Sequence, residues 1–286
     1  MKIIESYLQG KKKDQNLCED CLIISGRFCG VVDGGTDKTG IDWGKGQRGG
    51  KVLSLIVKNA FESNNDLPVE KIKKVINEKF QELAKKNGIN ISDRMNLPDA
   101  AAAIYDNKER KIYYIGDCKA RFVYITGKLS EQFIPDLRID LINSRLRKTI
   151  IDMLFELGIN PFRNGRDLGR EFITPLLKKQ SLLANTDSEG EWFMGIPYEA
   201  AKFNIINGVD EIIFNEIRVP KRVNEIIITS DGFVSVEKSL KLSMKMLNKS
   251  IKEDPCRCKK YLSTKGIGKG QVLPDDISYV RISMKD

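Results

Sequence analysis

Short apolar runs rich in Ile, Val, Phe and Tyr recur along the chain, and turn-forming residues bound most of them. Runs of this kind are typical of β-strands. The sequences SGR, DNKER and TGK separate neighbouring runs, which predicts antiparallel hairpins and meanders. The predicted strands are residues 21–25, 27–32, 101–105, 111–115, 121–126, 211–217, 225–229 and 277–283.

A second pattern places apolar residues every three or four positions, as on one face of a helix. The helices it predicts are residues 50–63, 69–87, 137–157, 169–183 and 234–252. Helices come in blocks and do not alternate with strands, so the chain is predicted to be an α+β protein and not a doubly wound one. Residues 132–208 break the pattern, and we interpret them as a flap-like insert in a single domain spanning residues 1–286.

Composition narrows the class of protein. The 286 residues carry a formal charge of +9, from 48 basic and 39 acidic side chains. No basic block is interleaved with aromatic residues, so the charge indicates a lysine-rich surface and gives no support to a nucleic-acid partner. The GKKKD run at residues 10–14 is accordingly interpreted as a solvated turn. No apolar run approaches the roughly 18 residues that span a membrane, and the first residues lack the apolar segment of a signal peptide. The sequence thus predicts a cytoplasmic protein.

The chain contains no histidine. This excludes Ser-His-Asp and Cys-His catalysis and every zinc site built on histidine. Cys18 and Cys21 form a C-x-x-C pair, and Cys256 and Cys258 form C-x-C. A four-cysteine zinc site is one interpretation, but the C-x-C spacing is not that of the familiar zinc ribbons. Reduced thiols that pack as small apolar side chains are the favoured interpretation.

Acidic residues stand at the ends of the predicted strands. They are Glu19, Asp20, Asp33, Asp117, Asp231, Asp275 and Asp276. A single carboxylate at a strand end usually forms a turn or caps a helix. Several such ends meeting at one edge would crowd the carboxylates, which raises their pKa values unless cations neutralise them. Hard divalent cations do so through oxygen ligands, and two such ions about 3.5–4 Å apart form a site for phosphoester hydrolysis.

The sequences around these acids resemble an ordered motif series. VVDGG, IYYIGDCKARFVYI, IIITSDGF and LPDDISYVRI, with LCEDCLII ahead of them, are similar to the motifs of the metal-dependent, type 2C serine/threonine protein phosphatases. The resemblance covers most of the chain outside residues 132–208. It looks like a divergent bacterial-type branch, because the loop DGGTDKTGIDWGKGQRGG is longer and more polar than usual; EDPCRCKKYLSTKG also fits that branch. It implies a four-layer α-β-β-α sandwich, with two central, mainly antiparallel sheets flanked by helices.

The resemblance also implies a cofactor and a reaction. Two Mn²⁺ or Mg²⁺ ions would be bound, with Asp33 bridging them and a weaker third ion at Asp117 and Asp231. The implied ligands are Glu19, Asp20, Asp33, the Gly34 carbonyl, Asp117, Asp231 and Asp275. A water that bridges the two ions would attack a phosphoserine or phosphothreonine monoester of a phosphorylated protein substrate. The implied enzyme is a phosphomonoesterase that needs no cysteine or histidine nucleophile.

The loop after Asp33 departs from the family pattern. Many members have a histidine there as general acid, whereas this chain has Thr36, Asp37 and Lys38. Lys38 or a metal-bound water are the candidates for protonating the leaving group, which an alkoxide needs in order to leave quickly.

Two further positions differ. Many members place a phosphate-binding arginine just before the Glu-Asp pair, where this chain reads KKKDQN, so Lys12, Lys13, Lys45 or Arg48 would supply the cation; Lys13 and Arg48 are the residues we predict. The usual Asp-Asn before the last strand is Asp275-Asp276 here. The extra carboxylate either raises the demand for metal or points to solvent.

Rival interpretations remain open. The missing histidine is compatible with a pseudophosphatase that keeps the fold as a binding or regulatory module, and a small phosphorylated metabolite is an alternative substrate. A nucleotide-binding role would rest on the sequence STKGIGKGQ, residues 263–271, but it does not match the phosphate-binding loop G-x-x-x-x-G-K-[ST]. We interpret this stretch as a loop bordering the active site ahead of Asp275. The sequence does not identify the substrate or the oligomeric state.

Overall fold

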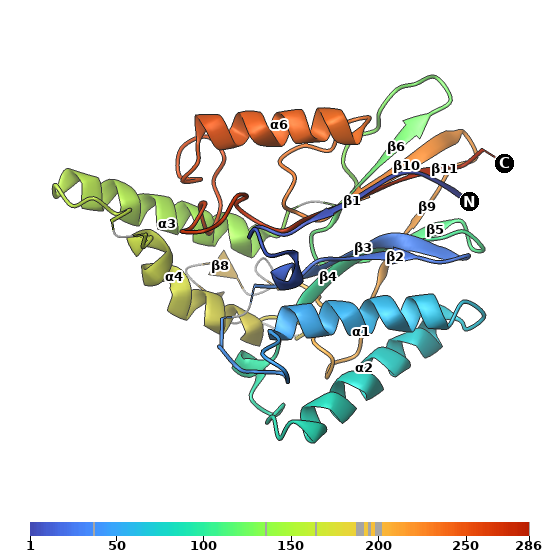
Figure 1. The fold of residues 1–286 in the computed structure, drawn as a ribbon, viewed down its shortest axis with the longest axis horizontal. Coiled ribbons are helices and arrows are strands. Elements are labelled where there is room, and N and C mark those ends of the chain that lie inside the picture. The colour runs from blue at the N-terminus through green and yellow to red at the C-terminus, as the bar shows by residue number, and fades with distance from the viewer. Residues whose placement is uncertain are drawn as a thin grey trace.

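The computed structural model describes residues 1–36, 38–134, 136–163, 165–186, 192–193, 196–197 and 202–285. Its strands form a four-stranded and a five-stranded antiparallel sheet, and a two-stranded ribbon joins β7 (Trp192–Phe193) to β8 (Ile196–Pro197). The two large sheets stack between layers of helices, with α6 outside one sheet and α1 and α2 outside the other (Figure 1). The predicted α+β sandwich is confirmed.

The four-stranded sheet has the order β1-β11-β10-β6. Its strands are β1 (Lys2–Gln9), β6 (Lys119–Tyr124), β10 (Val223–Thr229) and β11 (Ile277–Ser283). The sequence analysis missed β1. This edge strand alternates exposed and half-buried positions and contains no fully buried residue, so it lacks the apolar run by which the other strands were recognised.

The five-stranded sheet has the order β2-β3-β4-β5-β9. Its strands are β2 (Cys21–Ile24), β3 (Phe28–Gly34), β4 (Ala100–Asp106), β5 (Lys111–Ile115) and β9 (Asn215–Arg218). The prediction of a strand over residues 211–217 was wrong in its first half. Ile212 and Phe214 pack into the core from irregular backbone, which explains why an apolar run here is not a strand.

Alternation within the strands creates the core between the sheets. Val31 and Tyr105 from the five-stranded sheet pack with Ile228 and Val280 from the four-stranded sheet. Side chains in a strand point alternately to the two faces, so every second residue enters this layer. Burying each large apolar side chain contributes about 1.5–3 kcal/mol, which fixes the register of both sheets.

The helices α1 (Gly49–Ser63) and α2 (Val69–Lys86) cover the outer face of the five-stranded sheet. Phe61 of α1 meets Phe28 edge to face, with ring centroids 5.0 Å apart. On the other sheet, α6 (Leu240–Glu253) packs through Leu247. The predicted helix over residues 234–252 starts later because the Ser239 side chain caps the helix by accepting the amide of Leu242.

Two further helices, α3 (Arg138–Glu156) and α4 (Leu168–Lys179), lie beside the sandwich (Figure 1). The predicted helix over residues 169–183 is divided, since a 3₁₀ turn at Gln180–Leu182 follows α4. Other 3₁₀ turns are Gln15–Leu17 and Arg94–Asn96. No helix among the described residues is long and apolar enough to cross a membrane.

The cysteines follow the favoured interpretation. All six are free thiols, and all but Cys256 are buried. Burial raises the pKa of the Cys29 thiol to about 12, so it stays protonated and packs as an apolar group. Within the described ranges, no three acidic or cysteine side chains are placed as a metal-binding group.

Candidate active site

The predicted acids gather at one end of the sandwich. Asp33 lies near the end of β3, Asp117 follows β5 and Asp231 follows β10, while Asp20 and Asp276 immediately precede β2 and β11. Antiparallel pairing brings the start of β2 beside the end of β3, because Cys21 pairs with Val32. In the same way Thr229 pairs with Tyr279 at the start of β11. The topology therefore brings acids from five separate segments to one edge.

A cavity of about 370 Å³ opens at this edge. Four of the predicted metal ligands line it: Asp33, Asp117, Asp231 and Asp275. Glu19 and Asp20 are buried behind it. Basic side chains also line the cavity, namely Lys38, Lys119, Arg170, Arg257 and Lys265. The cavity is thus lined both by carboxylates and by cations that can face an anionic ligand.

Asp33 is surrounded by like charges. Burial raises the pKa of Asp33 well above its ordinary value, and the neighbouring carboxylates of Asp20, Asp231, Asp275 and Asp117 raise it further. Burial and the Asp275 carboxylate likewise raise the pKa of Asp231. Crowded carboxyl groups favour binding a proton over both being charged. A cation placed there would remove the need for this proton.

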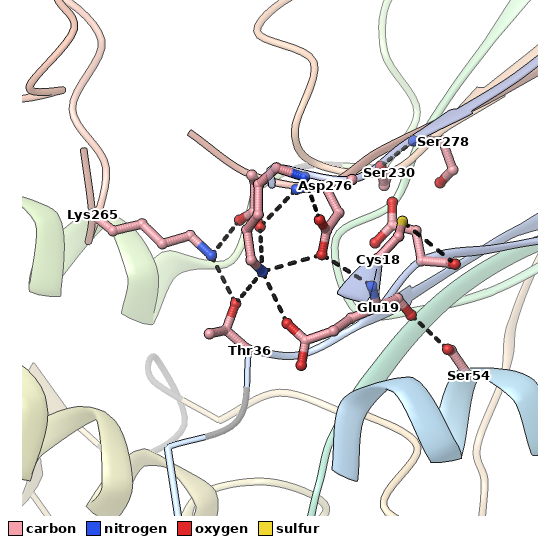
Figure 2. Close-up of polar contacts among 12 residues, drawn as sticks. Cys18, Glu19, Thr36, Ser54, Ser230, Lys265, Asp276 and Ser278 are labelled. Atoms are coloured by element: carbon pink, nitrogen blue, oxygen red, sulfur yellow. Dashed lines mark hydrogen bonds and ion pairs between the residues drawn. The ribbon is translucent and has the colours of Figure 1, made fainter. Parts of the chain in front are cut away.

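Asp20 is the least satisfied of these acids. It is 1 % exposed, and neither of its carboxylate oxygens has a hydrogen-bond partner among the described residues. Burial and the Asp276 carboxylate raise its pKa; the hydroxyls of Ser230 and Ser278 oppose this without reaching hydrogen-bond geometry. Figure 2 labels both serines near the acid cluster. A buried carboxylate without hydrogen-bond partners costs free energy. Asp20 is therefore suited to bind a cation at this edge of the sandwich.

Asp117 completes this group. Its pKa is raised by burial, then by Asp231 and Asp140, while Lys119 opposes the shift. The Lys119 ammonium donates to the backbone carbonyls of Asp231 and Phe233, at 3.1 and 2.8 Å. Lys119 therefore fixes the backbone of the loop that carries Asp231. Its ammonium contacts the Asp231 backbone carbonyl and forms no ion pair with the Asp231 carboxylate.

These acids fit a hard divalent cation in chemistry, since carboxylate oxygens are the ligands that Mg²⁺ and Mn²⁺ prefer. As placed, no three acidic or thiol side chains in the described part of the chain already form a metal-binding group. Binding an ion therefore requires these carboxylates to move from their present positions. The charge of the bound ion would relieve the mutual repulsion that raises their pKa values.

Lys11 was not predicted as a site residue, but its ammonium contacts three of the acids. Its ammonium lies 2.9 Å from Glu19 Oε2, 3.1 Å from Asp276 Oδ2 and 3.3 Å from Asp275 Oδ1. It also donates to Thr36 Oγ1 at 3.0 Å. Burial lowers the pKa of Lys11, but the three carboxylates outweigh burial and raise it well above its ordinary value. The interpretation of GKKKD as a solvated turn was wrong for this residue.

Lys265 lies beside Lys11. Its ammonium is 2.6 Å from Asp275 Oδ2 and donates to Thr36 Oγ1 at 2.8 Å (Figure 2). Burial raises the pKa of Asp275, but Lys265 and Lys11 outweigh burial and hold it at about 2. The expectation that residues 263–271 border the site ahead of Asp275 is confirmed at Ser263–Lys265, which line the cavity.

Of the two roles that the sequence left open for Asp276, the one in which it points to solvent is wrong, because the residue is 2 % exposed. It accepts the backbone amides of Lys11 at 2.6 Å and Glu19 at 3.1 Å, in addition to the Lys11 ammonium. The extra carboxylate therefore binds a lysine and the N-terminal segment of the site, and these contacts account for both of its oxygens.

The predicted phosphate-binding cations lie elsewhere. Lys13 and Arg48 are exposed and do not line the cavity. Lys38 does line it and forms an ion pair with Asp99 at 3.4 Å. Asp37, named in the same loop, lies outside the described residues. Arg170 of α4 lines the cavity and was missed, because nothing in the surrounding sequence NGRDLGR distinguishes it from a surface arginine.

Gly34 has a structural reason for lacking a side chain. A Cβ at this position would lie 2.5 Å from the backbone carbonyl oxygens of both Glu19 and Gly50. Such approaches leave no room for a methyl group, so the end of β3 can lie between these two segments only with glycine. The predicted role of the Gly34 carbonyl as a metal ligand stays a prediction.

Comparison with solved structures defines the class of fold. No protein-family model matches the sequence, and no curated protein matches it either. The fold is that of the bacterial type 2C-like serine/threonine phosphatases, and the low sequence identity fits the divergent branch that the motifs indicated.

Two structures carry this similarity. The serine/threonine phosphatase Stp1 from Staphylococcus aureus has 12% identity and a TM-score of 0.52, with 100% of this chain and 96% of that chain covered. A bacterial serine phosphatase that bears a single arginine-to-glutamate mutation has 11% identity and a TM-score of 0.50, with 100% and 99% covered. The PstP catalytic domain in complex with 2 manganese ions has 12% identity, a TM-score of 0.49 and 99% coverage of each chain.

Proposed function

We propose that this protein is a metal-dependent phosphatase that hydrolyses phosphoserine and phosphothreonine monoesters of a protein substrate. The observation that carries the proposal is a group of four crowded acids with raised pKa values, namely Asp20, Asp33, Asp117 and Asp231. The last three of these acids line a cavity that cationic side chains also line. Such a group is stable with charge only when a cation is present. Perturbed acids in a cavity are the usual mark of a functional site.

Asp20, Asp33, Asp117 and Asp231 would hold a divalent ion, Mn²⁺ or Mg²⁺. When bound, such an ion lowers the pKa of a coordinated water and so supplies the nucleophile for attack at phosphorus. Whether the Gly34 carbonyl joins them, and how many ions bind, are parts of the proposal that metal titration must answer. Asp33 is the central residue, because the other three all raise its pKa.

The cations of the cavity would orient the phosphate. Lys265 and Arg170 line it from opposite segments, the loop before β11 and helix α4. Arg170 donates to the carbonyl of Thr264 at 3.1 Å, so the two cations are held in one assembly. An arginine can bind two phosphate oxygens at once, whereas lysine acts as a point charge. This pair takes the role first assigned to Lys13 and Arg48.

Lys38 remains the candidate for protonating the leaving alkoxide. Its side chain lines the cavity, and its ion pair with Asp99 holds the ammonium near the wall. An ammonium group is a hydrogen-bond donor with protons to give, which a general acid requires. No histidine is present to compete for this role.

The proposal is tested by hydrolysis of a chromogenic phosphate ester and of a phosphoserine peptide, with Mn²⁺ added to metal-free protein. We expect metal-dependent turnover that Asp33→Asn and Asp231→Asn abolish. Equal activity in wild type and both variants would contradict the proposal. Faster turnover of small phosphorylated metabolites than of phosphopeptides would assign the alternative substrate class.

A binding module without turnover is the second candidate. The pairing of Glu19 and Asp275 with lysines favours it, because these two predicted ligands already have cationic partners. A module of this kind would bind a phosphopeptide with measurable affinity and hydrolyse none of it at any Mn²⁺ concentration. Calorimetric titration of the peptide beside the turnover assay separates the two functions.

A further inference from the structure

The acids of the site divide into two halves. The open half contains Asp20, Asp33, Asp117 and Asp231; among the described residues, no ion pair joins any of these four carboxylates to a lysine or arginine. The paired half contains Glu19, Asp275 and Asp276, together with the ammonium groups of Lys11 and Lys265. The resemblance to two-metal phosphatases assigns metal ligands to both halves, Glu19 and Asp275 in the paired half among them, but only the open half lacks cations.

Lys11 occupies the paired half as a bound cation would. Four oxygens lie within 3.3 Å of its ammonium nitrogen, from Glu19, Asp275, Asp276 and Thr36. Its side chain is only 7% exposed. Three carboxylates around one buried charge resemble the oxygen shell of a metal ion, and an ammonium satisfies them without being exchangeable.

The position of this ammonium is fixed through the backbone. The Lys11 amide donates to Asp276 Oδ1 at 2.6 Å, and the Lys11 carbonyl accepts the amide of Val272 at 2.8 Å. Asp276 therefore holds both the start and the end of the lysine side chain. A divalent ion bound to Glu19 and Asp275 would have to displace a tethered charge that cannot diffuse away.

We propose that Lys11 is a built-in cation that takes one of the two cation positions, so that the protein binds one divalent ion, in the open half. The inference rests on the proposed function only in taking the open half as the metal site. Asp276 is part of the same arrangement. The chain has a second aspartate where the resemblance predicts asparagine, and this carboxylate pairs with Lys11.

The test is the number of Mn²⁺ ions bound, counted by equilibrium dialysis with electron paramagnetic resonance of the bound ion. Wild type should bind one ion per chain with the six-line spectrum of an isolated Mn²⁺. Lys11→Met should bind two, with the broadened spectrum of two coupled ions. Lys12→Met is the matched control, because Lys12 is the exposed neighbour of Lys11 and carries the same charge. This variant should bind one ion.

A second variant provides the same test if Lys11→Met does not fold. Lys11→Met/Asp276→Asn removes one positive and one negative charge together, so the paired half keeps its net charge and Asp275 and Glu19 become available. It should also bind two ions. Wild type that binds two ions, or none, overturns the inference, as does a folded double variant that still binds one. Turnover is not measured, so a protein without phosphatase activity that binds one ion still supports it.

Discussion

Lys11 and Asp276, 265 positions apart in the sequence, are joined by two hydrogen bonds. The Lys11 backbone amide donates to Asp276 Oδ1 at 2.6 Å, and its ammonium donates to Oδ2 at 3.1 Å. The pair connects the segment after β1 to the segment before β11, whose strands are neighbours in one sheet. It therefore brings a lysine into a cluster of acids that would otherwise require a diffusible cation.

Replacing Asp33 by asparagine should separate stability from activity. The amide has a similar size, but it removes the central charge that burial and four carboxylates destabilise. Metal-free protein should gain stability of order 1 kcal/mol, whereas Mn²⁺-dependent turnover should fall by more than about 10–100-fold, because changing residues outside the ligand shell already costs that much. Thermal melts and steady-state kinetics measure the two effects.

The control for this change is Asp66→Asn, at an exposed position between α1 and α2. It should alter neither the melting temperature nor the turnover rate. Loss of stability in metal-free Asp33→Asn would contradict the repulsion among the acids.

Arg170→Ala should weaken substrate binding more than catalysis. Arg170 lines the cavity from α4 and carries a charge that an anionic phosphate can pair with. Removing a hydrogen bond between this charge and the bound substrate costs about 1.5–3 kcal/mol, so KM for a phosphopeptide should rise at least about 10-fold while kcat changes little. Arg163→Ala removes an exposed arginine from the same region and should leave KM unchanged. A fall in kcat with constant KM would argue for a different role of Arg170.

Arg147 should be essential for stability. Its side chain is 0% exposed and donates to Asp167 at 2.5 and 3.1 Å. It also donates to three backbone carbonyls in the segment that precedes Lys265, those of Cys256, Arg257 and Ser263. Breaking a buried ion pair from one side costs about 3–5 kcal/mol, so Arg147→Met should lower the free energy of unfolding by this amount.

Urea unfolding measures the effect, with Arg145→Met on the exposed side of the same helix as control. Arg145→Met should stay within about 0.5 kcal/mol of wild type. A small loss in Arg147→Met would show that α3 is not held to this loop by the arginine.

Asp254 gives a pH-dependent contribution to stability. Burial raises its pKa, but backbone amides outweigh burial and hold it below its ordinary value of 3.8. The donors are Tyr261, Lys259, Cys258 and Lys260, at 2.9–3.1 Å. A depressed pKa in the folded state stabilises the protein above the unfolded pKa, and this contribution is lost as the pH falls through the folded pKa.

Asp254→Asn should therefore destabilise the protein by about 1.5–3 kcal/mol at neutral pH. The difference from wild type should shrink as the pH falls below 3.8, where the carboxylate of the unfolded chain binds its proton, and should be lost as the pH falls through the lower pKa of the folded state. Denaturant unfolding of both proteins at several pH values checks this, and a difference that does not change with pH would refute the carboxylate's role.

The strands and their acids could be predicted because their signals are local. The β3 run that contains Asp33 near its end and the β10 run that precedes Asp231 are short apolar segments with a polar residue at the boundary, and both strands were predicted. The edge strand β1 escaped because its alternation buries no residue fully. The start of α6 was misplaced since its Ser239 cap is one of several polar residues that the sequence does not distinguish.

By itself the sequence determined the α+β class and the acids at the strand ends, because residue periodicity indicates which side chains enter the core and where strands end. The four-layer sandwich was implied by the resemblance of the motifs to the type 2C phosphatases. Only the tertiary structure decided which acids share a cation. Lys11 is one of three successive lysines, and its neighbours Lys12 and Lys13 are exposed. Its ammonium reaches Glu19 and Asp276 because β1 pairs with β11, a contact between the two ends of the chain that no local pattern encodes.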